Sequence, residues 1–142
     1  GGRIGIGSLA LGVGLAALDY ARAYLGEREQ FGTKIGNFQG LQWILADRYT
    51  ELEAARLLLM QAAWNKQRGL PFGTAASMAK LFASEKANDA CYSALQMMGG
   101  AGYIREYPLE RMARDVRITT IYEGTSEIQR LIIARDLLQD VL

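Results

Sequence analysis

Apolar residues recur at spacings of three and four along most of the chain, the period of α-helices that bury one face. The pattern predicts three long helices, at about Ile4 to Arg28, Phe38 to Arg68 and Thr74 to Met98. Clusters of glycine with one proline interrupt it between these ranges, which places turns there.

Small residues and polar caps add detail to these helices. Ser8, Gly12 and Ala16 recur every four residues on the first helix, so we expect this stripe to let another backbone approach closely. Asn37 and Thr74 precede apolar series and are predicted N-caps.

The third helix is predicted to end at Gly99-Gly100, which suits a glycine C-cap. A shorter helix is predicted at about Leu109 to Val116, and the β-branched run Ile118 to Tyr122 favours an extended segment. Ser126 and Gln129 have the spacing of a capping box that opens a last helix. The sequence therefore predicts an all-α fold, an up-and-down four-helix bundle with one additional short helix, in a single domain over residues 1–142.

Composition narrows the possible chemistry. The chain has 142 residues, 50% hydrophobic and 22% charged, as expected of one globular domain. A net charge of +1 provides no bulk field for a polyanion, so we expect no nucleic-acid partner. With no histidine and one cysteine, Cys91, the sequence favours neither a metal site nor a histidine-assisted nucleophile, and proton transfer needs a carboxylate, Lys or Tyr.

The most apolar stretch lies near the beginning of the chain. Ile4 to Leu18 contains no charge, but its fifteen residues include several glycines and are fewer than the roughly 20 that span a bilayer. It is interpreted as a buried helix and not as a membrane span or a signal peptide. Together with the single cysteine, this predicts a soluble, intracellular protein.

Glu123 is the strongest candidate for acid–base chemistry. It follows an apolar run and precedes Gly124 and a predicted helix N-terminus. Partial desolvation raises the pKa of a carboxylate and a helix N-terminus lowers it, so such a Glu can be tuned as a base. The same placement suits an acidic residue that only stabilises the helix dipole, and local physics alone favours that interpretation.

Four ordered motifs resemble the C-terminal domain of the acyl-CoA dehydrogenases. They are Ile121 to Arg130 (IYEGTSEIQR), Gln96 to Tyr103 (QMMGGAGY), Arg28 to Gly32 (REQFG) and Phe38-Gln39. The opening Gly2 to Ile6 and the string IYEGTSE are most similar to short-chain, butyryl-type members.

The resemblance implies that the chain is the C-terminal part of a longer flavoenzyme with three domains: helical, β and helical. Members use FAD to convert an acyl-CoA thioester to a trans-2-enoyl-CoA. The Glu at the position of Glu123 removes the α-proton as a hydride leaves the β-carbon. Some members place this base at the position of Gly2, where glycine cannot serve, which favours Glu123. The isolated domain is expected to be inactive.

The resemblance also implies roles around the cofactor. Arg28 would contact the FAD pyrophosphate, and Gln39 would lie near the cofactor. A further group would line the adenosine part of an FAD held mainly by a neighbouring subunit: Gln96, Met97, Met98, Gly99 and Gly100.

Other matching positions concern the flavin and the substrate. Thr125, Ser126 and Glu127 would meet the chain's own flavin, and Arg3 and Gly124 would lie close to the thioester and pantetheine.

Partners and compartment follow from the same resemblance. They are an acyl-CoA substrate, an electron-transfer flavoprotein as acceptor and a homotetramer built through the helical bundle, in a bacterial cytoplasm or a mitochondrial matrix. Two alternatives stay open, an acyl-CoA oxidase and a helical oligomerisation module without activity.

Overall fold

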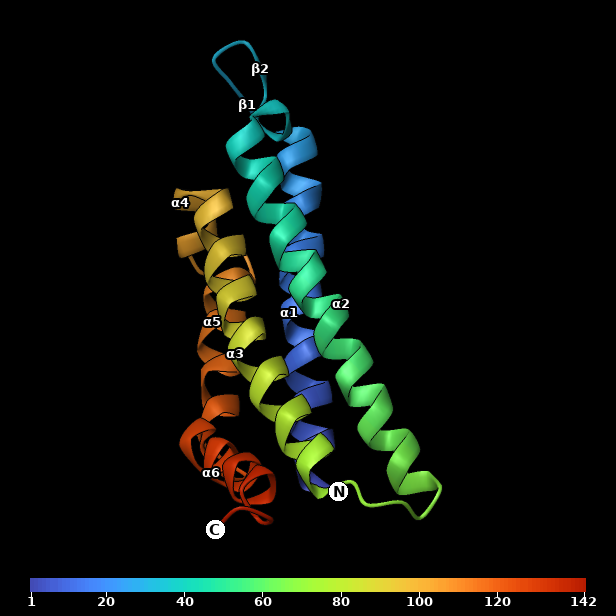
Figure 1. Cartoon of the computed structure of the whole chain (residues 1–142). Coiled ribbons are helices and arrows are strands. Elements are labelled where there is room, and N and C mark those ends of the chain that lie inside the picture. The colour runs from blue at the N-terminus through green and yellow to red at the C-terminus, as the bar shows by residue number, and fades with distance from the viewer.

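A computed structural model describes all residues from 1 to 142 and shows three long helices lying side by side (Figure 1). They are α1 (Gly2–Glu27), α2 (Gln39–Gln67) and α3 (Gly73–Met98). Their bounds lie within two residues of the predicted ranges. The structure thus confirms the predicted all-α fold. The prediction succeeds because the periodic apolar series determines both the existence and the length of each helix.

A small hairpin joins α1 to α2. It consists of β1 (Glu29–Gln30) and β2 (Thr33–Lys34), which pair antiparallel, and is followed by the short 3-10 helix η1 (Ile35–Asn37). The two residues at its tip, Phe31 and Gly32, have φ values of 54° and 78°, as a tight two-residue hairpin turn requires.

The fourth side of the bundle is built from several short helices. These are α4 (Gly100–Tyr103), α5 (Leu109–Arg117), the 3-10 helix η2 (Ile118–Thr120) and α6 (Ser126–Leu137). Figure 1 shows them following one another along α3, with α4 at the hairpin end and α6 at the end of the N-terminus. Several short helices therefore occupy the place of the fourth long helix of the bundle.

The predicted extended segment at Ile118 to Tyr122 is wrong. The backbone N–H groups of Ile121 and Tyr122 both donate to the Ile118 carbonyl, at 2.9 and 3.1 Å. Thr119 is buried and its hydroxyl donates to the Val116 carbonyl at 2.6 Å. These local bonds and the burial of Thr119 outweigh the preference of β-branched residues for extended backbone.

The core lies between the glycine and alanine faces of α1 and α3. A Cβ added at Gly7 would lie 3.5 Å from the Lys80 Cα, and one added at Gly14 would lie 3.2 Å from the Ala87 Cα. Glycine at these positions allows the two backbones to approach closely. The buried small residues of α1 are Gly7, Ala10, Gly14, Ala17 and Ala21.

The predicted small-residue stripe is therefore on the wrong face. Ser8, Gly12 and Ala16 are all exposed in this chain. Two small-residue stripes run along α1 with similar spacing, and the buried one is accompanied by Leu11 and Leu18. Burial of these larger side chains sets the rotation of the helix.

The three predicted side-chain caps are also wrong. Asn37 lies in η1 and donates to the Thr33 hydroxyl at 2.7 Å. Thr74 lies inside α3 and donates to Asp136 at 2.7 Å. Thr125, one residue earlier than expected, caps α6 by accepting from the Ile128 N–H at 3.3 Å. The glycine end of α3 is confirmed, because Gly99 is its C-cap with φ 59°.

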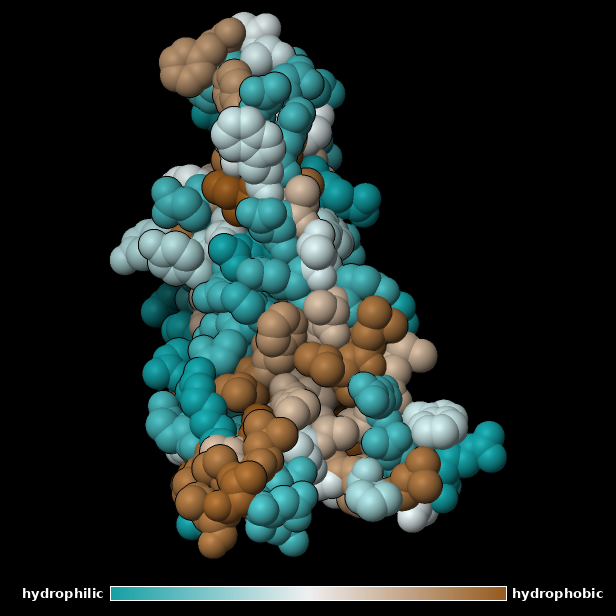
Figure 2. All heavy atoms as spheres, viewed as in Figure 1, coloured by the Kyte–Doolittle hydropathy of each residue, from teal (hydrophilic) through white to brown (hydrophobic).

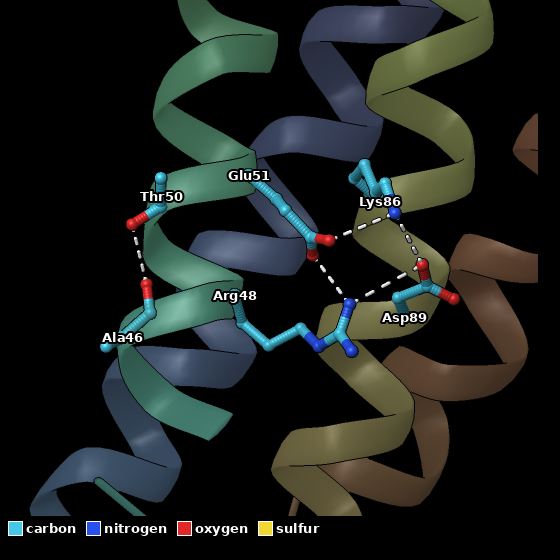
Figure 3. Close-up of polar contacts among 6 residues, drawn as sticks. All are labelled: Ala46, Arg48, Thr50, Glu51, Lys86 and Asp89. Carbon is cyan, nitrogen blue, oxygen red and sulfur yellow. Dashed lines mark hydrogen bonds and ion pairs between the residues drawn. The ribbon is translucent and has the colours of Figure 1, made fainter. Parts of the chain in front are cut away.

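An ion-pair quartet ties the middle of α2 to α3 (Figure 3). The Glu51 carboxylate accepts from Arg48 at 2.6 Å and pairs with Lys86 at 3.0 Å. Asp89 pairs with Lys86 at 3.3 Å and with Arg48 at 3.6 Å. The quartet therefore crosses the interface between the two helices twice.

By length and composition α1 could cross a membrane, since an 18-residue window within it has a mean hydropathy of 1.6. The uncharged run from Ile4 to Leu18, taken alone, was too short for this test. Core helices pass the same test, and 39% of the window is buried inside the structure. Gly7 and Gly14 of this run pack against the α3 backbone at Lys80 and Ala87, so one face of the run is buried in the core.

Candidate active site

Glu123 lies at the tip of a sharp turn between η2 and α6. Its φ is 55°, and the following Gly124 has φ 93°. A non-glycine residue in this left-handed region is uncommon, and such backbone persists only where surrounding contacts hold it. The turn therefore depends on its neighbours in the fold.

Two buried side chains hold the carbonyl groups of this turn. The Lys80 ammonium, on α3, donates to the Gly124 carbonyl at 2.7 Å. The Gln129 amide, on α6, donates to the same carbonyl at 3.0 Å and to the Glu123 carbonyl at 3.3 Å. Lys80 and Gln129 are each 0% exposed. The backbone beside the candidate base is thus fixed from two helices.

The Glu123 carboxylate lies over the first turn of α1. A Cβ added at Gly2 would be 2.2 Å from Glu123 Oε2 and 2.9 Å from its Cδ. Only glycine leaves room for the carboxylate at this place. The next residue, Arg3, donates to the Ser77 hydroxyl at 3.3 Å. The structure thus brings Glu123, Gly124 and Arg3 to one end of the bundle.

The start of α6 borders a hollow of about 260 Å³ at the same end. Thr125, Ser126 and Glu127 line it, and Glu85 faces them from α3. The Ser126 hydroxyl donates to a Glu85 carboxylate oxygen at 2.5 Å. Hydrogen bonds from its own backbone N–H and from the Thr125 hydroxyl lower the pKa of Glu127. Glu127 is therefore stabilised as the charged carboxylate at the start of α6.

A second hollow, of about 560 Å³, lies at the opposite end. Arg28 borders it at the end of α1, and the segment Gln96 to Gly100 borders it at the end of α3. A Cβ added at Gly99 or Gly100 would meet nothing within 4 Å, so this backbone is open to an approaching group. An exposed planar guanidinium beside open backbone suits an anionic group such as the pyrophosphate of FAD.

Gln39 borders neither hollow. It is the exposed first residue of α2. It lies at the hairpin end of the bundle, as Arg28 does, and its place near the cofactor stays a prediction.

The two ends are far apart. Arg3 and Arg28 are 25 positions apart at the two ends of α1. At about 1.5 Å per residue, about 38 Å separates them. Figure 1 agrees, with the N-terminus and α6 at one end and α4 and the hairpin at the other. The sequence-predicted residues thus form two groups and not one site.

Sequence reasoning missed Lys80, Gln129 and Glu85. Lys80 carried a usable signal, because it directly follows Ala79 on the alanine-rich face of α3, where a charged residue is unexpected. The spacing from Ser126 predicts Gln129 to be a capping partner, whereas its side chain holds the Gly124 carbonyl. No group of three or more His, Cys, Asp or Glu side chains is placed to hold a metal ion.

Residues 1–138 match the family model described as the C-terminal domain of acyl-CoA dehydrogenase. Among curated proteins, the chain is 53% identical to a probable acyl-CoA dehydrogenase of Bacillus subtilis, over 98% of this chain and 37% of that protein. It is 52% identical to the short-chain specific acyl-CoA dehydrogenase of Clostridium acetobutylicum, over 94% and 35%. Identity is also 52% with the bovine mitochondrial short-chain specific enzyme, over 97% and 34%. The chain thus spans about a third of the length of these relatives.

Solved structures similar to this chain support the same family. Butyryl-CoA dehydrogenase from Megasphaera elsdenii superposes with a TM-score of 0.95 at 45% identity, over 96% of this chain and 36% of that one. A chain in a structure described as the electron transferring flavoprotein of Acidaminococcus fermentans superposes with a TM-score of 0.97 at 48% identity, over 99% and 37%.

Proposed function

The chain belongs to the acyl-CoA dehydrogenase family, and we propose that it acts as the C-terminal domain of a longer, three-domain flavoenzyme that dehydrogenates an acyl-CoA thioester. In this proposal residues 1–142 form one domain, and Glu123 is the base. One observation carries it: the Glu123 carboxylate lies over Gly2, on a turn whose carbonyls are held by buried donors.

The chemistry assigned to this chain is a proton transfer. Glu123 takes the α-proton of the thioester, and Arg3 and Gly124 lie beside it where the thioester and pantetheine would pass. Bound FAD would supply the acceptor for the hydride that leaves the β-carbon, and the product would be the trans-2-enoyl-CoA. The carboxylate holds the abstracted proton until product leaves.

The two groups of residues would serve two cofactor molecules. Thr125, Ser126 and Glu127 lie at the Glu123 end and would meet the flavin of their own subunit. Arg28, with its planar fork, would bind the pyrophosphate of another FAD beside Gln96 to Gly100. Because about 38 Å along α1 separates the two groups, we assign them to two FAD molecules. This separation supports an FAD held mainly by a neighbouring subunit.

Such sharing requires an oligomer, and the surface supports one. Figure 2 shows apolar side chains gathered over the end where the C-terminus lies. The exposed large apolar residues of α2 and α6 are Trp43, Ile44, Leu57, Met60, Trp64, Ile128, Leu131 and Leu137. Exposed apolar surface of this kind is typical of an interface. We propose a homotetramer assembled through the helical bundle.

The electron acceptor proposed is an electron-transfer flavoprotein. The structural match described as the electron transferring flavoprotein of Acidaminococcus fermentans supports this assignment. The relatives, from Bacillus and from bovine mitochondria, support a soluble enzyme of a bacterial cytoplasm or a mitochondrial matrix. The lean toward short acyl chains rests on the two short-chain specific relatives.

Stopped-flow mixing of the full-length protein with butyryl-, octanoyl- and palmitoyl-CoA tests the proposal. We expect anaerobic bleaching of bound flavin, fastest with butyryl-CoA, and no bleaching with the isolated domain. Hydrogen peroxide production in air at the rate of turnover would assign an oxidase instead. A full-length protein that purifies without flavin and binds none would leave only an oligomerisation module.

A further inference from the structure

The most unexpected charge in the chain is the buried ammonium of Lys80. The residue is 0% exposed, on the buried face of α3, whose other members are uncharged and mostly alanine and serine. Transferring an ammonium group from water to a protein interior is costly unless acceptors and opposite charges surround it. A position that served packing alone would hold an apolar side chain.

The acceptor of this ammonium is the backbone of the Glu123 turn. Lys80 Nζ lies 2.7 Å from the Gly124 carbonyl oxygen, the distance of a charge-assisted hydrogen bond. Burial lowers the pKa of Lys80, and the carboxylates of Glu85 and Glu123 oppose that lowering. The charge of Lys80 therefore acts on both the turn and the carboxylate that the turn presents.

Gln129 completes the clamp on the other side. Its amide nitrogen donates to the carbonyls of Glu123 and Gly124, at 3.3 and 3.0 Å. Both partners are acceptors, so the amide must present its nitrogen to them. The Gly124 carbonyl thus accepts two hydrogen bonds, and its position is fixed from α3 and from α6.

This clamp matters because the turn is strained. The strain lies at Glu123, a non-glycine residue with φ 55°, whereas Gly124 adopts its positive φ freely. Strained backbone relaxes when its supporting contacts are removed. A relaxed turn would move the Glu123 carboxylate away from its place above Gly2.

We propose that Lys80 is a positioning residue for the base, which acts through its hydrogen bond to the Gly124 carbonyl and keeps the Glu123 carboxylate over the first turn of α1. The inference rests on the proposed function, because it concerns the reaction in which Glu123 is the base. In this proposal Lys80 acts through the turn and not by contact with substrate or cofactor.

The test compares Lys80→Met with Lys86→Met in the full-length flavoenzyme. Methionine keeps the length of the lysine stem, and Gln129 still donates to the Gly124 carbonyl, so no buried acceptor is orphaned. Lys86 lies on the same helix but pairs with Glu51 and Asp89, and it makes no bond to the turn. Each variant thus removes one ammonium from α3.

Flavin reduction by butyryl-CoA is measured per bound FAD, so loss of cofactor or of folded protein does not alter the rate. We expect the limiting rate at saturation to fall by about 10-fold to 100-fold in Lys80→Met, since small displacements of a reacting group have effects of this size. The Kd for butyryl-CoA should stay within threefold of wild type. Lys86→Met should reduce its flavin at the wild-type rate.

A Lys80→Met enzyme that reduces its flavin within threefold of wild type overturns the proposal, as does an equal loss in Lys86→Met. Lys80→Gln is measured in parallel, with the same expected loss, and decides the matter if the methionine variant does not fold. Glu123→Gln separates the two levels of inference. If Glu123→Gln abolishes reduction and neither Lys80 variant slows it, only the role of Lys80 fails. If butyryl-CoA does not reduce the flavin of wild type, or if Glu123→Gln reduces its flavin at the wild-type rate, the proposed function itself fails.

Discussion

The two ends of the bundle carry their candidate residues in different ways. At one end Glu123 sits on a turn whose carbonyls are held by Lys80 and Gln129, and Ser126 is bonded to Glu85. At the other end Arg28 is exposed and borders an open hollow beside Gly99-Gly100. Contacts within this chain hold the residues of the first end in place, whereas the residues of the second end are exposed to solvent.

This difference fits the proposed function, in which one end carries out proton transfer and the other binds FAD. If Glu123 is the base, as proposed, it must be held in place to act in a transition state, and the chain itself supplies its supporting contacts. In the proposed oligomer, the surface around Arg28 would be completed by the partner subunit. Substitutions near Glu123 should therefore change the rate of the chemical step, and substitutions near Arg28 should change retention of FAD.

The largest expected effect comes from Glu123→Gln in the full-length enzyme. Glutamine keeps the size of glutamate but cannot accept the α-proton, so flavin reduction by acyl-CoA should slow by about 10²–10⁴-fold. FAD content and acyl-CoA affinity should hardly change. Stopped-flow bleaching of the flavin measures the rate. Reduction within tenfold of wild type would place the base elsewhere, with Glu127 as the next candidate.

Gly2→Ala should misplace the same base without removing it. The new methyl would stand 2.2 Å from Glu123 Oε2, and the flexible carboxylate would move aside. We expect the reduction rate to fall by about 10-fold to 100-fold, as for other small displacements of a reacting group. Gly5→Ala is the matched control, because a Cβ there meets nothing within 4 Å. Equal rates in the two variants would show that Glu123 does not act from above Gly2.

The sequence was sufficient to predict the long helices and their bounds, but not the residues that cap them. Three long apolar series specified α1, α2 and α3 to within two residues. The caps failed because other partners took these side chains: Thr74 and Ser126 make tertiary hydrogen bonds to Asp136 and Glu85, and Asn37 makes a local one to Thr33. The segment from Ile118 failed because burial of Thr119 outweighed local preference.

The candidate site was predictable only as a set of residues. The family motifs named Glu123, Arg28 and Gly99-Gly100, but spacing along the chain gave no sign that they form two groups about 38 Å apart. The clamp was not predictable, because Lys80 is 43 positions from Glu123 in sequence and meets its turn only through the packing of α3.

Arg28→Lys tests the other end. Lysine keeps the charge but loses the planar fork, at a cost of about 1–3 kcal/mol in bonds to an anion. The Kd for FAD should therefore rise by about 5-fold to 150-fold, while flavin that remains bound is reduced at the wild-type rate. Gel filtration followed by absorbance shows the retained FAD. Arg22→Lys, in an exposed pair with Asp19 on the same helix, should retain it fully. Tight FAD binding in Arg28→Lys would mean that Arg28 does not bind the cofactor.

The smallest effect is expected midway between the two ends, at the ion-pair quartet. Glu51→Gln weakens the bonds from Arg48 and Lys86, whose side chains are about a quarter exposed, and should cost about 1 kcal/mol of local unfolding free energy. Hydrogen exchange of α2 and α3 amides in the full-length enzyme measures this loss, while reduction rate and FAD retention should stay at wild-type values.

The hydrogen bond from Lys86 to Glu51 raises the pKa of Lys86 in the folded protein. Its stabilising contribution is thus complete below the ordinary lysine value of about 10.5 and disappears as pH rises through the raised value. The gap in stability between wild type and Glu51→Gln should accordingly narrow above about pH 10.5. A gap that stays constant there would assign the stabilisation to Arg48 alone, and a changed reduction rate in Glu51→Gln would contradict the separation of the middle of the bundle from its reactive end.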